Sequence, residues 1–138
     1  MTVSLDLIGR DDVDAHWDVL EPFVVRALTG IEDEMWPCDV RDEAIAGRMM
    51  LFLISVKGEP KGVVVTSVKV TPRISYLYID MLGGFDMSEW MTYALNSVKV
   101  VAEGLGLPKV KALGRDGWRR FADDNGFKMK RTLFELEI

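Results

Sequence analysis

Three strand-like stretches follow one another so closely between residues 51 and 82 that the turns between them limit the possible folds. The stretches cover residues 51–57, 61–70 and 74–82, and the second is rich in β-branched residues. Short turns at residues 58–60 and 71–73 separate them. A parallel connection needs a dozen or more residues, so these turns can only reverse the chain. We therefore predict an antiparallel meander.

The sequence before the meander predicts one strand and two helices. Residues 3–7 alternate between apolar and polar side chains, as in a strand. Apolar residues then recur at helical spacing over residues 13–28, and Pro22 is expected to kink or restart that helix. Asp39 is expected to cap a second helix that runs to about residue 50.

The sequence after the meander predicts two more strand and helix pairs. An apolar stripe over residues 87–105 indicates a long helix, with Asp86 and Glu89 spaced as in a capping box. Residues 109–113 should then form a strand parallel to residues 74–82, through a right-handed crossover. A short helix at 115–124 should stop at Asn125-Gly126, and residues 127–138 are expected to form a final strand, irregular near Lys130-Arg131.

The predicted order of elements is β-α-α-β-β-β-α-β-α-β. This order predicts an α/β fold (α+β, with a mixed sheet) whose helices cover both faces of the sheet. We expect one domain over residues 1–138. This order resembles the GNAT superfamily of acyl-CoA-dependent N-acyltransferases. The resemblance also rests on Leu82-Gly83-Gly84 before the long helix, residues 102–107 closing it, and Gly126-Phe127. Residues 114–118, with the sequence Gly-Arg-Asp-Gly-Trp, look like short GNAT-like proteins of tailed bacteriophages.

The resemblance implies an acetyl-CoA site that this chain only partly preserves. In active GNAT enzymes the turn after the fourth strand reads Gln or Arg, two residues, Gly, one residue, then Gly or Ala, and its amides hold a pyrophosphate. Here the corresponding turn offers Gly83, Gly84, Phe85 and Ser88 as the residues that would bind acetyl-CoA. Asp86 places a negative charge beside these amides, and as an N-cap it would use the same donors.

A second GNAT signature is missing from residues 115–122. The family pattern places an Asn, an Ala and a Tyr ahead of Gly-Phe, and the Tyr often protonates the departing thiolate. Counted back from Gly126-Phe127, these positions hold Arg115, Trp118 and Ala122. Alanine cannot donate a proton, and this departure argues against standard acetyl transfer.

Other candidate residues for chemistry are few. Asp80 lies where some GNAT enzymes carry a carboxylate base, and Tyr76 and Tyr78 should share its face by strand alternation. The alternative for Asp80 is a carboxylate that is only hydrogen-bonded. His16 has no second histidine with which to form a metal pair or triad, and Cys38, the only cysteine, is an improbable nucleophile. We expect no metal site.

Charge is unevenly spread along a chain whose formal net charge is −5. Residues 1–56 hold 4 basic and 12 acidic side chains, whereas residues 57–138 hold 13 basic and 10 acidic ones. A segment rich in Trp and Arg is a candidate protein interface, because these residues anchor interfaces; it contains Arg115, Trp118, Arg119 and Arg120. The alternative is that Trp118 is part of the core and the arginines are solvated.

Two classes of function remain open from the sequence. The first is a GNAT-fold protein that has no catalytic activity and binds no cofactor. It would act as a structural or assembly component, plausibly of a bacteriophage virion, by associating with itself or with other protein subunits. The alternative is an acetyl-CoA-dependent N-acetyltransferase with a divergent site that uses water and Asp80; a third, weaker option is binding of CoA or a nucleotide without chemistry. No apolar run reaches the roughly 18 residues that a membrane span needs, and no secretory signal is visible. We therefore expect the protein to be located in the bacterial cytoplasm and, under the first hypothesis, to be incorporated into a phage particle. An acidic chain without an aromatic platform is a poor nucleic-acid binder.

Overall fold

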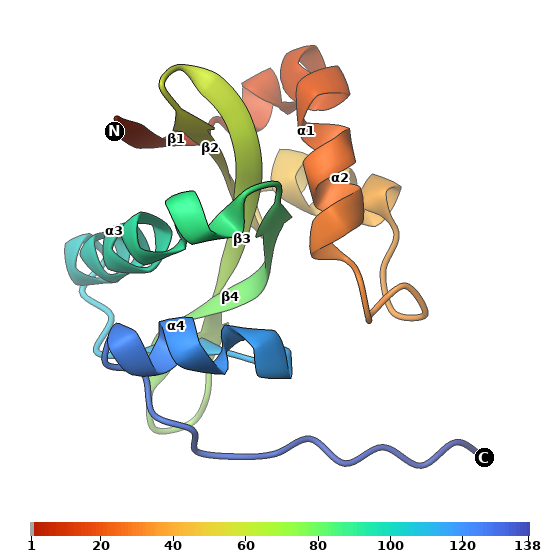
Figure 1. Cartoon of the computed structure of the whole chain (residues 1–138). Coiled ribbons are helices and arrows are strands. Elements are labelled where there is room, and N and C mark those ends of the chain that lie inside the picture. The colour runs from red at the N-terminus through yellow and green to blue at the C-terminus, as the bar shows by residue number, and fades with distance from the viewer. Residues whose placement is uncertain (1) are drawn as a thin grey trace.

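A five-stranded mixed sheet forms the centre of the protein (Figure 1). The computed structural model describes residues 2–138, apart from the side chain of Asp116. The strands lie side by side in chain order, β1 to β4 are antiparallel, and β5 runs parallel to β4. Their bounds are β1 Val3–Ile8, β2 Met50–Val56, β3 Glu59–Val70, β4 Ser75–Gly84 and β5 Val110–Ala112. The predicted meander and the predicted parallel pairing are both confirmed.

Helices cover both faces of the sheet, as the sequence predicts. Helices α1 and α2 pack on one face, and α3 packs on the other, with the hydrophobic side chains of α4 beside it. The four helices span α1 Val13–Ala27, α2 Pro37–Ala46, α3 Met91–Gly104 and α4 Arg119–Asp124. Single 3-10 turns precede three of them, at η1 Arg10–Asp12, η2 Met87–Glu89 and η3 Asp116–Trp118. Within residues 2–138, no helix has the length and apolar character needed to cross a membrane.

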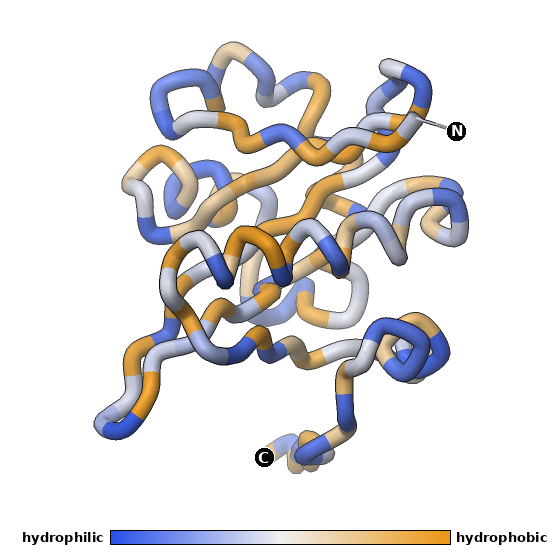
Figure 2. The backbone as a smooth tube through the Cα atoms, turned by 90° about the vertical axis from the view of Figure 1, so that its left-hand side faces the viewer, coloured by the Kyte–Doolittle hydropathy of each residue, from blue (hydrophilic) through white to orange (hydrophobic). Residues whose placement is uncertain are grey.

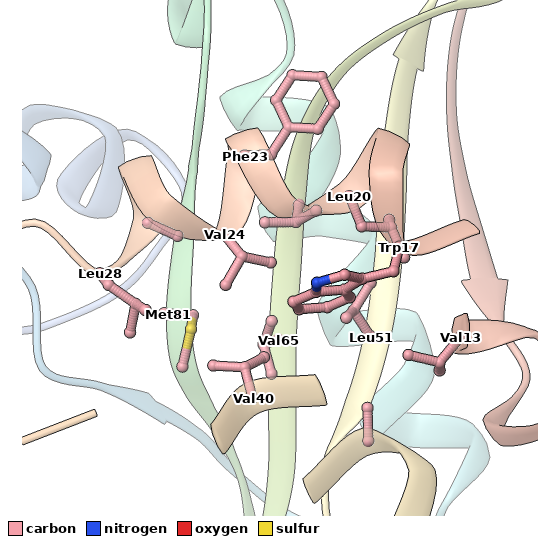
Figure 3. Close-up of a cluster of buried hydrophobic side chains, with 13 residues drawn as sticks. Val13, Trp17, Leu20, Phe23, Val24, Leu28, Val40, Leu51, Val65 and Met81 are labelled. Carbon is pink, nitrogen blue, oxygen red and sulfur yellow. The ribbon is translucent and has the colours of Figure 1, made fainter. Parts of the chain in front are cut away.

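The first of two buried clusters joins helices α1 and α2 to the sheet. Figure 3 shows Trp17 and Leu20 of α1 pointing toward Leu51 and Val65 of the strands, with Met81 of β4 closing one side. The Trp17 indole N–H donates to Glu21 Oε2 at 2.9 Å, so the ring is buried without losing its hydrogen bond. This cluster fixes α1 across β3 and β4.

The second cluster lies on the opposite face, beneath α3 and beside α4. Figure 2 views the molecule from the α3 side and shows apolar stretches of the sheet behind this helix. Trp90 is fully buried there among Phe52, Ile54 and Leu82, and its indole N–H donates to the Phe85 carbonyl at 2.8 Å. This tryptophan therefore ties the beginning of α3 to the end of β4.

Two predicted helix boundaries are wrong, for local reasons. Helix α1 continues through Pro22 without restarting, because its buried side chains hold both halves against the first cluster. Asp39 does cap α2, but from inside its first turn: the helix begins at Pro37, and the Asp39 carboxylate accepts a hydrogen bond from the Trp36 amide at 2.9 Å. Gly47, with φ of 80°, ends α2 four residues before the predicted position.

The predicted capping box at Asp86 and Glu89 is also wrong. Helix α3 begins at Met91, after the 3-10 turn η2. Asp86 itself has φ of 54°, and its side chain makes no capping bond to the helix. Its carboxylate instead accepts a hydrogen bond from Lys61 Nζ at 3.0 Å. A cation on the neighbouring strand thus outcompetes the local backbone donors.

The predicted final strand over residues 127–138 does not form in the single chain. Phe127 still packs against the second cluster, but every residue from Lys128 to Ile138 is exposed and outside regular structure. In Figures 1 and 2 this segment lies outside the body of the molecule, below α4. A strand forms only where it has an edge to pair with, and this segment leaves the sheet instead of returning to it.

Gly126 has the backbone conformation that its position after a helix predicts. Its φ is 82°, in the left-handed region that side chains resist, although an added Cβ would meet no atom within 4 Å. We expect Gly126→Val to lower the free energy of unfolding by about 1 kcal/mol or more through backbone strain alone. Gly104→Val, in α3 and equally uncrowded, is the control and should change stability by less than about 0.5 kcal/mol. Equal effects in chemical denaturation would contradict the assignment.

Candidate active site

A β-bulge in β4 places Asp80 at the site. Val65 of β3 pairs with Met81 and the next residue, Thr66, pairs with Ile79, so Asp80 is the extra residue of the bulge. Before the bulge Leu77 and Ile79 face the second cluster, whereas Met81 faces the first. The bulge therefore changes the phase of β4 and leaves Asp80 beside Met81, on the α1 and α2 face.

Polar side chains from β3 and β4 surround Asp80 and form what we call the Asp80 cluster: Ser67, Lys69, Tyr76, Tyr78 and Asp80. Lys69 Nζ lies 3.8 Å from Asp80 Oδ1 and 5.4 Å from the centre of the Tyr78 ring. Lys111 of β5 reaches the Tyr76 ring, with Nζ 4.3 Å from its centre. The prediction that both tyrosines share the face of Asp80 agrees with this arrangement, and the structure adds three residues that sequence reasoning missed.

Asp80 is a carboxyl group whose charged form is disfavoured. Its side chain is only 9% exposed, and Oδ2 has no hydrogen-bond partner among the described residues. Burial raises the pKa of Asp80 above its ordinary value, and the neighbouring Ser67 hydroxyl and Lys69 ammonium offset part of that rise. Burial, followed by the charge of Asp80, likewise raises the pKa of Tyr78. A carboxyl with a raised pKa is suited to accept a proton near neutral pH.

A hollow of about 550 Å³ adjoins the Asp80 cluster at the end of α2. It is lined by Ser67 and Lys69 of β3 together with Glu43, Arg48 and Met49. Glu43 and Arg48 form a two-point ion pair across its rim, at 2.7 and 3.0 Å. The hollow gives a small molecule a route to the edge of the Asp80 cluster.

The turn after β4 is held mainly by contacts within the chain. A Cβ on Gly83 would lie 2.6 Å from Ala27 Cα of α1, and one on Gly84 would lie 2.2 Å from the Lys61 carbonyl oxygen. The Phe85 amide already donates to that carbonyl at 2.8 Å. These glycines are therefore explained by close packing, and the Phe85 amide is not available to a ligand.

Two further amides follow in the same turn. The amides of Met87 and Ser88 open a helical turn, where a helix has no carbonyl of its own to pair with them. The Asp86 carboxylate pairs with Lys61 instead of accepting hydrogen bonds from these amides. The hydrogen bond from Lys61 to Asp86 raises the pKa of Lys61. The sequence-based objection that Asp86 blocks the turn is thus weakened by the structure.

The residues at the missing GNAT signature serve the fold. Trp118 is half-buried against the second cluster, and a Cβ on Gly114 would lie 2.7 Å from its ring. Ala122 lies in the middle of α4 and carries no group that could donate a proton. Trp118 is thus partly buried at the edge of the core, while Arg115, Arg119 and Arg120 lie on the surface. Their role in association stays a prediction.

The other candidates have no arrangement for chemistry. His16 is exposed on α1, with Nδ1 2.9 Å from the Asp12 carbonyl oxygen, and Cys38 is an exposed free thiol on α2. Among the described residues, no group of three His, Cys, Asp or Glu side chains is placed to hold a metal ion.

Comparison with known proteins identifies the fold. No family model and no curated protein sequence matches the chain. A solved aminoglycoside acetyltransferase from an uncultured soil metagenomic sample superposes with a TM-score of 0.72 at 10% identity, covering 99% of this chain and 95% of that one. The chain has the GNAT acetyltransferase fold.

Two further GNAT-fold structures contain the acyl donor or its product. An acetyltransferase from Clostridium acetobutylicum, solved with acetyl-CoA, matches with a TM-score of 0.70 at 11% identity and covers 99% of this chain and 96% of that chain. The aminoglycoside N-acetyltransferase AAC(6')-Iy, in complex with CoA, gives 0.71 at 11% identity, with 99% and 95% covered. Identities this low establish the fold and leave activity to be argued from the site.

The raised pKa of Asp80 predicts that replacing it stabilises the protein at neutral pH. The folded state favours the protonated carboxyl, so the stabilisation from Asp80 is complete below the unfolded-state pKa, near 3.8, and is lost as pH rises through the folded-state value. Asp80→Asn cannot ionise and should therefore melt higher than the wild type at pH 7, with the difference disappearing toward pH 3.5.

Scanning calorimetry of both proteins from pH 3.5 to pH 8 tests this expectation. Asp33→Asn, which replaces an exposed carboxylate in the loop after α1, is the matched control and should show little pH-dependent difference. A lower melting temperature for Asp80→Asn at pH 7 would mean that the charged carboxylate is well solvated or fully paired.

Proposed function

We propose that this protein is an acyltransferase that transfers the acetyl group of acetyl-CoA to an amine. The observation that carries the proposal is the buried Asp80 carboxyl, with its raised pKa, at a bulge of the strand beside β5. Pairing between β4 and β5 stops at Ile79 and Ala112, whereas β4 continues to Gly84. The β4 peptide groups beyond Ile79 thus have no strand beside them on that edge, which supports a binding place for an extended ligand.

Asp80 is the proton acceptor in this proposal. The amine nitrogen attacks the thioester carbonyl carbon, the carbon–sulfur bond breaks, and CoA leaves as the thiolate. The proton lost from the amine passes to Asp80, directly or through one water, and water protonates the thiolate because Ala122 cannot. The Lys69 ammonium, 3.8 Å from Asp80 Oδ1, lowers the pKa of that carboxyl and so favours the ionised form that accepts the proton.

The same residues support a small cationic amine as the acceptor. Asp80 supplies a carboxylate, and the charge of Glu34 acts on the same face from the loop before α2, whereas Lys111 and Lys69 already lie over the Tyr76 and Tyr78 rings. Carboxylates attract an ammonium group. For the donor, the Met87 and Ser88 amides, with Lys61 nearby, would hold the anionic part of acetyl-CoA.

Acetyl-CoA binding and turnover test the proposal directly. We expect calorimetry to detect acetyl-CoA binding, and a thiol-release assay with a panel of polyamines and aminoglycosides to detect turnover. Asp80→Asn should lower kcat by about 10²- to 10⁴-fold, the range for loss of a general base, while acetyl-CoA binding is retained. Asp33→Asn should leave both unchanged, and turnover that survives Asp80→Asn would remove Asp80 from the mechanism.

Lys69 gives a second test through the pH profile. Lys69 lowers the pKa of Asp80, so Lys69→Met should move the acidic limb of kcat/KM to higher pH. Activity at high pH, where Asp80 is ionised in both proteins, should fall much less. A uniform loss at all pH values would assign Lys69 to substrate binding.

A non-catalytic assembly role is the second candidate, and the observation that favours it is the pair Trp118 and Ala122. These residues replace the family's Ala and Tyr with a packing side chain and an inert one. In this case the protein would associate with other subunits, in the bacterial cytoplasm or a phage particle, and calorimetry with acetyl-CoA would show no heat of binding. The Arg119→Glu/Arg120→Glu variant would then lose assembly while retaining its circular-dichroism spectrum.

A further inference from the structure

The ion pair between Lys69 and Asp80 is open. Lys69 Nζ lies 3.8 Å from Asp80 Oδ1, which is longer than a hydrogen bond. The Asp80 side chain is only 9% exposed, yet its Oδ2 atom has no hydrogen-bond partner among the described residues. Buried polar groups are normally hydrogen-bonded. A ligand group that donates to this carboxyl, and another that accepts from Lys69, would therefore complete the pair.

The charges on this face of the sheet are mixed in sign. Lys69 and Lys111 contribute two ammonium groups, and Asp80 and Glu34 contribute two carboxyl groups. A polycationic acceptor would add positive charges to a face that already carries two, and like charges disfavour binding. An acceptor that carries a carboxylate beside its amine matches both signs.

An α-amino acid has the spacing that the open pair requires. Its ammonium and its carboxylate are joined through one carbon and lie about 3 Å apart. This separation is close to the 3.8 Å between Lys69 Nζ and Asp80 Oδ1. The ammonium can donate to Asp80 while the carboxylate accepts from Lys69, whose side chain is 46% exposed and therefore reachable. Each charge then has a partner of opposite sign.

The hollow beside Lys69 can take the side chain of such an amino acid. Val68 is 45% exposed and Leu105 is 51% exposed, so apolar surface on its wall is uncovered. Glu43 and Arg48 at the rim neutralise each other in their ion pair. The apolar lining residues are Met49, Met50, Val68 and Leu105. Covering this surface favours an apolar side chain over a charged one.

We propose that the acceptor is a free α-amino acid with an apolar side chain, whose ammonium faces Asp80 and whose carboxylate binds Lys69. The inference rests on the proposed acyltransferase function and narrows its acceptor. The ammonium gives one proton to the Asp80 carboxylate, and the neutral nitrogen attacks the thioester carbon. The carbon–sulfur bond breaks, and water carries the second proton of the nitrogen to the thiolate. N-acetyl amino acid and CoA leave, and Asp80 returns its proton to solvent.

Matched acceptors test whether the carboxylate is recognised. L-phenylalanine and L-leucine are compared with phenethylamine and isoamylamine, which lack only the carboxylate, in a thiol-release assay with acetyl-CoA. We expect kcat/KM to be at least about 10-fold higher for the amino acids, because the contact with Lys69 is a hydrogen bond between charged groups. Any effect of Lys69 on Asp80 is common to both kinds of acceptor, so the ratio of their kcat/KM values isolates the contact with the carboxylate.

Variants of Lys69 assign the preference to this residue. Lys69→Met should remove it by raising KM for the amino acids, while KM for the two amines does not rise. Lys69→Arg keeps the positive charge and should retain the preference. Lys99→Met removes an exposed lysine of α3, on the other face of the sheet, and should behave as the wild type. A preference that survives Lys69→Met would overturn the inference.

Calorimetry without acetyl-CoA separates this inference from the proposed function. L-phenylalanine should bind, whereas phenethylamine and 3-phenylpropionate, which each lack one of its charged groups, should bind at least about 10-fold more weakly. This order of binding without any turnover would support the amino acid site and overturn the transfer reaction. Equal turnover of phenylalanine and phenethylamine would overturn the amino acid site and leave the transfer reaction standing. Neither binding nor turnover of the amino acids would also overturn the amino acid site.

Discussion

Pairing of strand β4 is the constraint on which the rest of the structure depends. It joins the antiparallel meander to the parallel β5, and its side chains contribute to both buried clusters. One extra residue at Asp80 changes which cluster the strand faces, so Ile79 and Met81, two residues apart, pack on opposite sides of the sheet. Because both clusters specify the register on either side of the bulge, a buried carboxyl is held in the middle of an apolar sheet. Its desolvation is a local cost that the packing around it offsets.

The electrostatics of the site come from pairs that join different strands. Lys69 of β3 approaches Asp80 of β4, and Lys61 of β3 holds Asp86 at the end of β4. The first pair moderates a carboxyl whose pKa is raised by burial, and the second removes a negative charge from the beginning of α3. The first pair lies on the α1 and α2 face of the sheet, whereas the second lies at the beginning of α3.

Strand β5 lies at the edge of the sheet, and residues 128–138 lie outside it. GNAT-fold neighbours match over nearly the whole chain, so residues 128–138 lie within the region of shared architecture. Here that segment has the composition of a strand and the exposure of a tail.

Local pattern in the sequence was sufficient for the order of elements, the antiparallel meander, the parallel β5 and the left-handed Gly126, because periodicity, turn length and glycine stereochemistry act over a few residues. It also placed Tyr76 and Tyr78 on the face of Asp80. It could not supply Lys69, Ser67 or Lys61 as partners, since those contacts depend on the register between β3 and β4. It misassigned Asp86 because the nearest backbone donor is not always the strongest partner once strands and helix ends come together. The predicted strand over residues 127–138 does not form for the same physical reason. Alternation determines that a segment can be a strand, whereas only tertiary structure decides which sheet edge it pairs with.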